Sequence, residues 1–367
     1  MSMEVRKIIL VAGARPNFMK IAPLMHAIEN QKTIEPILIH TGQHYDEQMS
    51  ELFFKQLEIP EPHVNLEVGS ASHAVQTARI MERFEKVCLE IGPAMVMVVG
   101  DVNSTIACTL VASKLGIVTA HYEAGLRSGD RSMPEEINRI VTDSICDYFF
   151  TTSKDANENL IKEGKQTDNI FLVGNLMIDT LMRLLKKATI EGLRNSEIEG
   201  LDDKYALVTL HRPSNVDHSE MLLSIMKELQ KLAHHMPVIF PVHPRTRLRI
   251  SDIGYRISEK QQLYLIDPIG YLEFLSLQKN ATVVITDSGG IQEETTVLGI
   301  PCLTMRENTE RPITVWEGTN KLVGVNDIEY EVEEILKGNG KKGKVPDLWD
   351  GKAAERIVSI LIERIRW

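Results

Sequence analysis

The sequence has too few cysteines, and none of them close together, to build a disulfide framework or a zinc site. Its four cysteines lie far apart and form no Cys-x-x-Cys pair (Cys88, Cys108, Cys146 and Cys302). It also lacks any apolar run approaching the roughly 18 residues that a membrane-spanning helix needs. The apolar run at residues 8–12 is too short for a signal peptide. We therefore expect a soluble protein of the reducing cytoplasm.

An excess of positive charge is absent as well. The formal net charge is −10 at pH 7, which argues against nucleic-acid binding, because that affinity depends on excess Lys and Arg. A small anionic ligand is still compatible with this charge if a few cations gather in one cleft. No strand-like run is followed by Gly-x-Gly-x-x-Gly, so the usual nicotinamide or flavin site is not predicted.

Short apolar runs alternate with helix-period segments along the whole chain, which is typical of parallel sheets covered on both faces. At 367 residues the chain exceeds the size at which one core stops growing, so we expect two domains. The strands expected in the first half are residues 7–11, 35–40, 95–99, 117–121, 148–151 and 170–173. Those expected in the second half are residues 205–209, 237–240, 263–266, 282–286 and 301–304.

These patterns predict an α/β protein with two doubly wound parallel-sheet domains. We place the first at residues 1–173 and the second at residues 174–351. The segment 176–201 is polar with a helical period and is interpreted as a connector between the domains. The segment 352–367 is a strongly amphipathic helix that can fold back on either domain.

Ligands of open parallel sheets bind beyond the carboxyl ends of the strands. Polar residues that follow the apolar runs are therefore the candidates. After the first run, Arg15 and Lys20 offer two cations five residues apart, which suits a phosphate group. The alternative for Lys20 is a solvated position on the following helix.

Three carboxylates are expected at one edge of the first sheet: Asp101, Glu123 and Glu135. Mutual repulsion and partial burial would raise the pKa of some of them, as acid and base roles require. The alternative is structural: Asp101 caps the following helix, and Glu135 complements a helix dipole.

In the second half, His211 and His243 each follow a strand and can face a cleft. Arg245, Arg247 and Arg249 are expected to form a solvated face. The spacing of His40 and His44 resembles a metal pair, but the residues between them are loop-like and no third ligand is evident, so no metal site is predicted.

The strongest local signal in the chain is the segment Asp287–Glu294. A buried strand feeds a turn of Ser288, Gly289 and Gly290 that opens a helix, which leaves backbone N–H groups facing outward. Glycine lets a phosphate approach the backbone closely. Glu294 lies about 9 Å further up the helix, a reach that suits ribose hydroxyls. We predict a nucleotide diphosphate site here; the alternative is an ordinary strand–helix turn.

Taken together, these residues resemble the non-hydrolysing UDP-N-acetylglucosamine 2-epimerases. The resemblance covers nearly the whole chain in the right order. It is carried by the segments Gly13–Pro16, Gly100-Asp101, His121–Arg127, Pro134–Glu136, Asp287–Glu294 and Thr309–Pro312.

The resemblance implies a glycosyltransferase-B-like fold, in which two Rossmann-like domains flank a cleft and a C-terminal helix returns to the first domain. It also implies a homodimer that interconverts UDP-N-acetylglucosamine and UDP-N-acetylmannosamine without NAD, metal or another cofactor. The product would feed cell-surface polysaccharide precursors. In the family, UDP leaves to give a 2-acetamidoglucal and then adds back.

By resemblance, the catalytic carboxylates are those of the first domain. Asp101 and Glu135 match the proton acceptor and donor, with their order left open. Glu123 matches a residue that stabilises positive charge on the sugar ring or positions its neighbours. Arg15 and Lys20 match residues that hold the diphosphate.

The second domain carries the residues that match the nucleotide site. His211 matches a residue that assists departure of the diphosphate, and Arg311 matches a further diphosphate contact, with His243 close by. Ser288, Gly289 and Gly290 match the phosphate cradle, and Glu294 matches the ribose carboxylate.

One departure from the family concerns regulation. Many members carry an arginine where this chain has Pro213, and in some bacterial members that arginine supports an allosteric site. Its loss puts allosteric activation by substrate in doubt here.

Three alternatives stay open from the sequence. One is a 2-epimerase for another UDP-hexosamine, such as a 2,3-diacetamido uronic acid. Another is an inverting UDP-sugar glycosyltransferase of the same fold, and the third is a nucleotide-sugar binding module without turnover.

Overall fold

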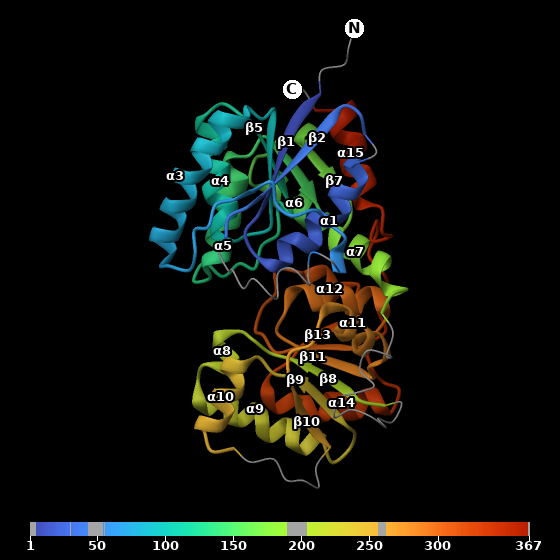
Figure 1. Cartoon of the computed structure of the whole chain (residues 1–367). Coiled ribbons are helices and arrows are strands. Elements are labelled where there is room, and N and C mark those ends of the chain that lie inside the picture. The colour runs from blue at the N-terminus through green and yellow to red at the C-terminus, as the bar shows by residue number, and fades with distance from the viewer. Residues whose placement is uncertain are drawn as a thin grey trace. The chain divides into compact units, whose positions relative to one another are not determined.

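The computed structural model describes residues 5–29, 31–42, 54, 56–188, 204–255 and 262–365. The chain divides into two compact units. Unit 1 comprises Met1–Arg183 and Asp347–Trp367, and unit 2 comprises Leu184–Pro346. Each unit contains one parallel sheet with helices on both of its faces (Figure 1).

The sheet of unit 1 has seven strands in the order β3-β2-β1-β4-β5-β6-β7. All of its neighbouring strands are parallel. β4 shows why these runs form strands, since its five residues, Met95–Val99, are all buried and mostly β-branched. The seven strands are β1 (Arg6–Ala12), β2 (Ile34–His40), β3 (Val64–Asn65), β4 (Met95–Val99), β5 (Val118–Tyr122), β6 (Tyr148–Thr151) and β7 (Ile170–Leu172).

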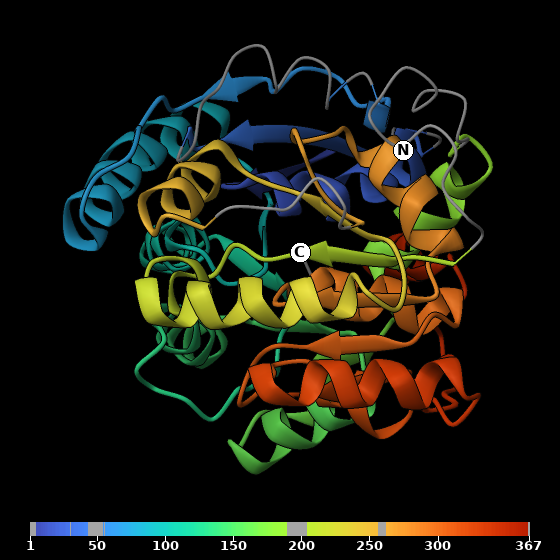
Figure 2. The same ribbon diagram turned by 90° about the horizontal axis from the view of Figure 1, so that it is seen from below.

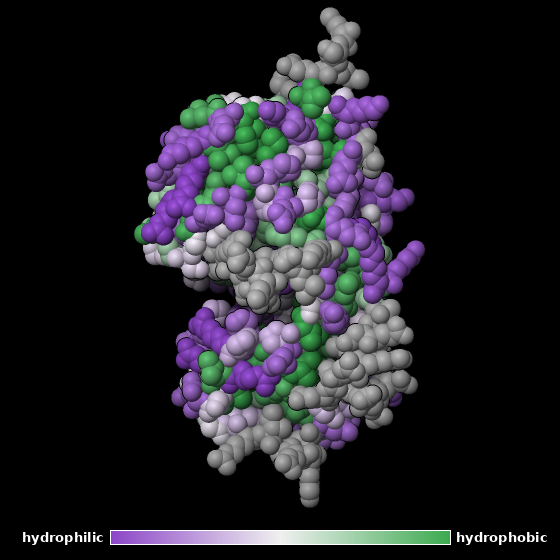
Figure 3. Space-filling view, viewed as in Figure 1, coloured by the Kyte–Doolittle hydropathy of each residue, from purple (hydrophilic) through white to green (hydrophobic). Residues whose placement is uncertain are grey.

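Helices cover both faces of this sheet. α3, α4 and α5 lie side by side on one face, whereas α1 and α15 pack together on the other (Figure 1). α3 buries Gln76, Ile80, Phe84 and Cys88 at intervals of four residues, and its outer surface is hydrophilic (Figure 3). The helices are α1 (Arg15–Glu29), α3 (His73–Ile91), α4 (Asn103–Lys114), α5 (Pro134–Ile145), α6 (Lys154–Lys162), α7 (Leu176–Leu185) and α15 (Ala353–Glu363).

Unit 2 repeats this plan with a six-stranded parallel sheet in the order β10-β9-β8-β11-β12-β13. α9 and α14 lie side by side (Figure 2), while α12 contacts α11 and α13. The strands are β8 (Ala206–Thr209), β9 (Val238–Pro241), β10 (Leu263–Ile266), β11 (Val283–Thr286), β12 (Cys302–Thr304) and β13 (Asn320–Leu322). The helices are α8 (Pro213–Val216), α9 (Ser219–Leu232), α10 (Pro244–Asp252), α11 (Tyr271–Asn280), α12 (Gly289–Leu298), α13 (Pro312–Trp316) and α14 (Ile328–Leu336).

The doubly wound α/β architecture predicted from the sequence is confirmed. In each sheet the strand order reverses at one point, between β1 and β4 in unit 1 and between β8 and β11 in unit 2. Ligands of such sheets bind at the carboxyl ends of the strands beside this reversal. No helix in the described part of the chain is long and apolar enough to cross a membrane.

Two strands were missed and one segment was misinterpreted. β3 and β13 span only two and three residues, too few for a periodic signal. The segment 176–201 is not a polar connector throughout, because its first part forms α7. Leu176, Ile178, Leu181 and Leu184 of this helix are fully buried. Residues 189–203 lie outside the described residues.

α7 also moves the domain boundary. The Thr180 hydroxyl donates to the Met19 carbonyl of α1 (2.5 Å), and Arg183 forms an ion pair with Glu58 (3.0 Å). Unit 1 therefore runs to Arg183 rather than ending at residue 173, because α7 packs with α1.

The C-terminal segment of the chain is attached to the rest of unit 1 by a buried tryptophan and by a cap on its helix. Trp349 is 1% exposed, and its indole N–H donates to the Thr152 carbonyl (2.8 Å). The Asp179 carboxylate accepts hydrogen bonds from the backbone N–H groups of Ala353 (3.1 Å) and Ala354 (2.7 Å) at the start of α15. These contacts fix the C-terminal helix against α1 and α7.

The cap makes the stability of the protein depend on pH. Burial raises the pKa of Asp179 to about 6, above its unfolded value of about 3.9. The folded state therefore binds the proton more tightly, and this stabilisation is lost as pH rises from about 4 through 6. We expect the free energy of unfolding of the wild type to fall by about 1–2 kcal/mol more than that of Asp179→Asn between pH 5 and pH 8. Urea denaturation of both proteins measures the difference, and parallel pH profiles would contradict it.

Candidate functional site

Asn17 ties the loop after β1 to the end of β4. Its side-chain oxygen accepts hydrogen bonds from the N–H groups of Gly13 (3.0 Å) and Ala14 (2.9 Å), and its amide nitrogen donates to the Val99 carbonyl (3.0 Å). Asn17 is buried, so these bonds are shielded from water. The side chain thus joins the two strands that flank the strand-order reversal of unit 1.

Gly100 is the point at which three loops meet. It has a φ of +74°, which favours glycine. A Cβ atom there would lie 3.2 Å from the Asn17 amide nitrogen, 3.4 Å from a Glu123 carboxylate oxygen and 3.5 Å from the Lys20 ammonium. The loops after β1, β4 and β5 therefore converge beside Gly100, where the sequence places Asp101.

Lys20 and Glu123 form a buried ion pair at this point. The Lys20 ammonium lies 2.6 Å from a Glu123 carboxylate oxygen, and the two side chains are 8% and 3% exposed. Glu123 has a φ of +73°, a strained conformation that persists where the surroundings enforce it, often at functional sites. The solvated alternative for Lys20 is therefore wrong. Arg15, the first residue of α1, is exposed.

Asp101 pairs with Arg139 of α5. A guanidinium nitrogen of Arg139 hydrogen-bonds a carboxylate oxygen of Asp101, and Arg139 also reaches Glu136 through two bonds (3.0 and 2.7 Å). The capping alternative for Asp101 is wrong, because α4 begins after Val102 and has no side-chain cap. The spacing of three residues on one helix indicates the Glu136–Arg139 pair, but it gives no sign of the Asp101–Arg139 pair.

Glu136 is surrounded by hydrogen-bond donors, whereas Glu135 has no partner within the described residues. The Glu136 carboxylate accepts hydrogen bonds from the N–H groups of Ser128 (3.0 Å) and Gly129 (2.9 Å). Although burial opposes it, these bonds and the Arg139 guanidinium lower the pKa of Glu136. The half-buried Glu135 carboxylate, at the start of α5, has no hydrogen bond or ion pair within the described residues.

A second buried charge network lies beneath these residues and was missed in the sequence. His121 at the end of β5 contacts Asp143 of α5 (2.6 Å) and the Gly100 carbonyl (2.8 Å). Asp143 also accepts from the Gly125 N–H (2.9 Å) and pairs with Arg127 (2.8 Å). Despite complete burial, these partners lower the pKa of Asp143. The expected repulsion among carboxylates is thus offset by cations at this edge.

In unit 2, Asp287 holds the loop that follows β8. This fully buried carboxylate accepts hydrogen bonds from the backbone N–H groups of His211 (3.0 Å) and Arg212 (2.9 Å) and from the Asn215 amide (3.0 Å). It also pairs with the His211 imidazole (2.9 Å). Although burial opposes it, these partners lower the pKa of Asp287.

α12 begins at Gly289 with Ser288 as its cap residue, and no side-chain hydrogen bond caps the helix. The N–H of Ser288 donates to the Thr286 hydroxyl (3.0 Å), which leaves the N–H groups of the first helical turn for a ligand. A Cβ atom at Gly289 would lie 2.6 Å from a Glu310 carboxylate oxygen. Any side chain at this position would therefore force the Glu310 carboxylate to shift.

Glu294 is a buried carboxylate with one unsatisfied oxygen. It is 1% exposed, and one oxygen accepts a hydrogen bond from the Tyr271 hydroxyl (2.8 Å). The other oxygen forms no hydrogen bond of good geometry among the described residues, although the Gln278 amide lies close enough to oppose the rise in the pKa of this carboxyl. Burial raises the pKa of Glu294 to about 7. An unpaired buried acceptor of this kind is what a ligand hydroxyl would satisfy.

Arg311 and His243 occupy different settings. Arg311 is buried and lies 2.6 Å from a carboxylate oxygen of Glu293 on α12. His243 is exposed at the end of the neighbouring strand β9, and its ring accepts from the Arg245 N–H (3.3 Å). Arg245, Arg247 and Arg249 are exposed on α10, as expected for a solvated face.

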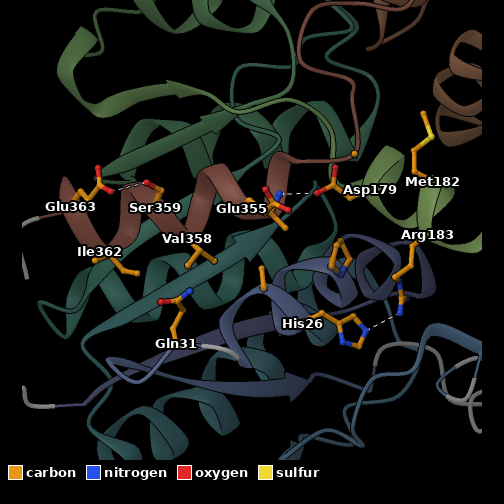
Figure 4. Close-up of a pocket in the computed structure, with 14 residues that line it drawn as sticks. His26, Gln31, Asp179, Met182, Arg183, Glu355, Val358, Ser359, Ile362 and Glu363 are labelled. Atoms are coloured by element: carbon orange, nitrogen blue, oxygen red, sulfur yellow. Dashed lines mark hydrogen bonds between the residues drawn. The ribbon is translucent and has the colours of Figure 1, made fainter.

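A cavity of about 780 Å³ lies among α1, α7 and α15 of unit 1 (Figure 4). His26 meets Arg183 in it (2.9 Å), and Ser359 meets Glu363 (3.0 Å). None of the residues predicted to bind a ligand or to act in catalysis lines it. We therefore do not assign it to the site.

Several known proteins are similar to this chain over nearly its whole length. A family model described as UDP-N-acetylglucosamine 2-epimerase matches residues 26–362. The UDP-N-acetylglucosamine 2-epimerase of Methanocaldococcus jannaschii is 43% identical over 364 residues, which cover 97% of this chain and 98% of that protein. A crystal structure of the enzyme from that organism, in complex with UDP-GlcNAc and UDP, has a TM-score of 0.88 at 42% identity and covers 97% of this chain and 99% of that one.

Two further similarities bear on substrate and fold. The UDP-2,3-diacetamido-2,3-dideoxy-D-glucuronate 2-epimerase of Pseudomonas aeruginosa is 42% identical over 360 residues, which cover 97% of this chain and 99% of that protein. The structure of a lipopolysaccharide outer core galactosyltransferase has a TM-score of 0.54 at 15% identity, covering 98% of this chain and all of that one. The fold is therefore glycosyltransferase-B-like.

Asp101 and Glu136 share the guanidinium of Arg139, so removal of this cation should destabilise the protein. Arg139→Met leaves both carboxylates without their guanidinium, so we expect the free energy of unfolding at pH 7 to fall by about 3 kcal/mol or more. Because the pKa of Glu136 is lowered in the folded state, the contribution of its ionised carboxylate to the free energy of unfolding is lost as pH falls. The difference in free energy of unfolding between Arg139→Met and the wild type should therefore become smaller at acidic pH.

Urea denaturation measures this difference, with Arg79→Met as the matched control. Arg79 is exposed on α3, so its removal should change the free energy of unfolding by no more than about 0.5 kcal/mol. Equal stability of the two variants at pH 7 would show that Arg139 is not needed to hold the carboxylates.

Proposed function

The chain belongs to the UDP-N-acetylglucosamine 2-epimerase family, and we propose that it interconverts UDP-N-acetylglucosamine and UDP-N-acetylmannosamine. It is an isomerase that acts at C2 of a UDP-hexosamine. The observation that carries the proposal is the gathering of Asp101 and Glu123 around Gly100 in unit 1, with Glu135 at the start of the adjoining α5. An epimerase needs proton-handling groups on both faces of C2, whereas an inverting glycosyltransferase needs one base.

The C2 proton of the sugar is not next to a carbonyl, so direct removal would be slow. We infer that the C1–O bond to UDP breaks as the C2 proton leaves, giving a 2-acetamidoglucal and UDP. UDP then adds back to C1 while a proton arrives at the opposite face of C2. The enzyme must therefore stabilise charge on the departing diphosphate and keep both fragments bound.

We assign the proton transfers to Asp101 and Glu135, one on each face of C2. Asp101 is partly exposed and oriented by Arg139, and Glu135 has no competing partner in the described chain. Glu123 is buried and already paired with Lys20. That environment suits stabilisation of positive charge on the sugar ring better than proton exchange.

The diphosphate and ribose are assigned to unit 2, with Arg15 and Lys20 of unit 1 as further diphosphate contacts. The N–H groups at the start of α12 suit phosphate oxygens, so we place the phosphate cradle at Ser288, Gly289 and Gly290. His211, Arg311 and His243 would support the diphosphate there. The unsatisfied oxygen of Glu294 suits a ribose hydroxyl.

A 2-epimerase for a diacetamido uronate is the second candidate, because the Pseudomonas relative is about as similar as the archaeal one. A uronate would bring one more carboxylate to the sugar site. Among the described residues near Gly100, the buried cation Lys20 is paired with Glu123 and assigned to the diphosphate, and Arg139 is paired with Asp101. That pairing favours an uncharged hexosamine.

Incubation with UDP-N-acetylglucosamine in D₂O tests the proposal by proton NMR. We expect deuterium at C2 and the appearance of UDP-N-acetylmannosamine. If deuterium enters C2 of the UDP-diacetamido uronate but not C2 of UDP-N-acetylglucosamine, the result favours the second candidate. Free N-acetylmannosamine with UDP would indicate a hydrolysing enzyme.

The same assay tests the proton-transfer assignment. Asp101→Asn and Glu135→Gln should each lower turnover by roughly 10²-fold or more, the usual share of general acid–base catalysis. Both variants remaining near the wild-type rate would show that other groups move the proton.

A further inference from the structure

We propose that Asp287 is a positioning residue for His211, and that it acts through the imidazole without touching the nucleotide. This inference rests on the function proposed above and assigns Asp287 a different task from the rest of its segment. The Asp287 carboxylate is 0% exposed, so it cannot reach a ligand. Its negative charge would also repel a diphosphate.

The carboxylate instead faces the loop after β8. β8 and β11 are neighbours at the strand-order reversal of unit 2, so the residues that follow them lie side by side. Asp287 accepts from the N–H groups of His211 and Arg212 and from the Asn215 amide. The Arg212 side chain donates back to the Asp287 carbonyl (3.0 Å). One buried carboxylate thus fixes the path of the whole loop.

The imidazole contact determines which ring nitrogen faces outward. Nδ1 of His211 lies 2.9 Å from a carboxylate oxygen of Asp287. An ionised carboxylate only accepts hydrogen bonds, so Nδ1 must carry the proton. The side chain of His211 is 61% exposed, and its Nε2 has no hydrogen bond within the described residues. Nε2 is therefore the nitrogen presented to a ligand.

This arrangement has a consequence for departure of UDP. When the ring is charged, Nε2 carries a proton that it can donate to a phosphate oxygen as negative charge grows there. Without the Asp287 contact the neutral ring can carry its proton on Nε2 instead of Nδ1, and the ring is free to rotate away from the phosphate oxygen. Asp287 would therefore affect turnover more than binding of the substrate.

A double-mutant cycle separates this role from general support of the fold. We expect His211→Asn to lower kcat by about 10²-fold and Asp287→Asn to cause a loss of similar order, with little change in KM. In the His211→Asn background, Asp287→Asn should change kcat by less than about threefold, because the partner it acts through is gone. If the kcat losses of the two single variants multiply in the double variant, the proposal is overturned.

Asn215→Ala is the matched control. It removes one donor to the same carboxylate but leaves the imidazole contact in place. Its effect on kcat should therefore be the same in the wild-type and His211→Asn backgrounds. If the effect of Asn215→Ala on kcat also shrinks in the His211→Asn background, as that of Asp287→Asn is expected to do, then the loop rather than the imidazole transmits the effect.

A measurement on the wild-type protein keeps the proposal testable if Asp287→Asn does not fold. In ¹⁵N NMR of histidine-labelled protein, the signals lost in His211→Asn identify the His211 ring. We expect a neutral ring at high pH with its proton on Nδ1. A proton on Nε2 would overturn the proposal. This readout needs no turnover, so it is distinct from an inactive wild type, which would instead contradict the proposed function.

Discussion

Burial of carboxylates at the carboxyl ends of two parallel sheets constrains the rest of this structure. A carboxylate removed from water is tolerated only when cations or N–H donors surround it. Glu123 is paired with Lys20, Glu136 shares Arg139 with the partly exposed Asp101, and Asp287 is surrounded by the donors of the β8 loop. These pairings determine where the loops run, and the loops in turn carry the groups assigned to the chemistry.

The carboxylates fall into two groups by their partners. Those with complete partner sets, such as Asp143 and Asp287, have a lowered pKa and organise their surroundings. Glu294 has an unsatisfied oxygen and a pKa raised to about 7, and Glu135 has no partner in the described chain. A ligand would complete the second group, which is why we assign ribose binding to Glu294 and one of the two proton transfers to Glu135.

Much of the fold was predictable from the sequence, because strands buried on both faces appear as continuous apolar runs. The loops of the site were predictable for the same reason, since parallel strands bring their carboxyl ends to one edge. The partner of Asp101 was not predictable, because Arg139 lies 38 residues away and only the packing of α5 brings it close. Asp287 was placed at the correct edge, but a sequence pattern cannot show that its carboxylate faces the β8 loop rather than the ligand.

The central claim is that UDP leaves the sugar and adds back within the same active site. The most direct test supplies the separated fragments, 2-acetamidoglucal and UDP, to the protein. The account predicts that both UDP-N-acetylglucosamine and UDP-N-acetylmannosamine form. A protein that epimerises UDP-N-acetylglucosamine but leaves the glycal and UDP unchanged would contradict it.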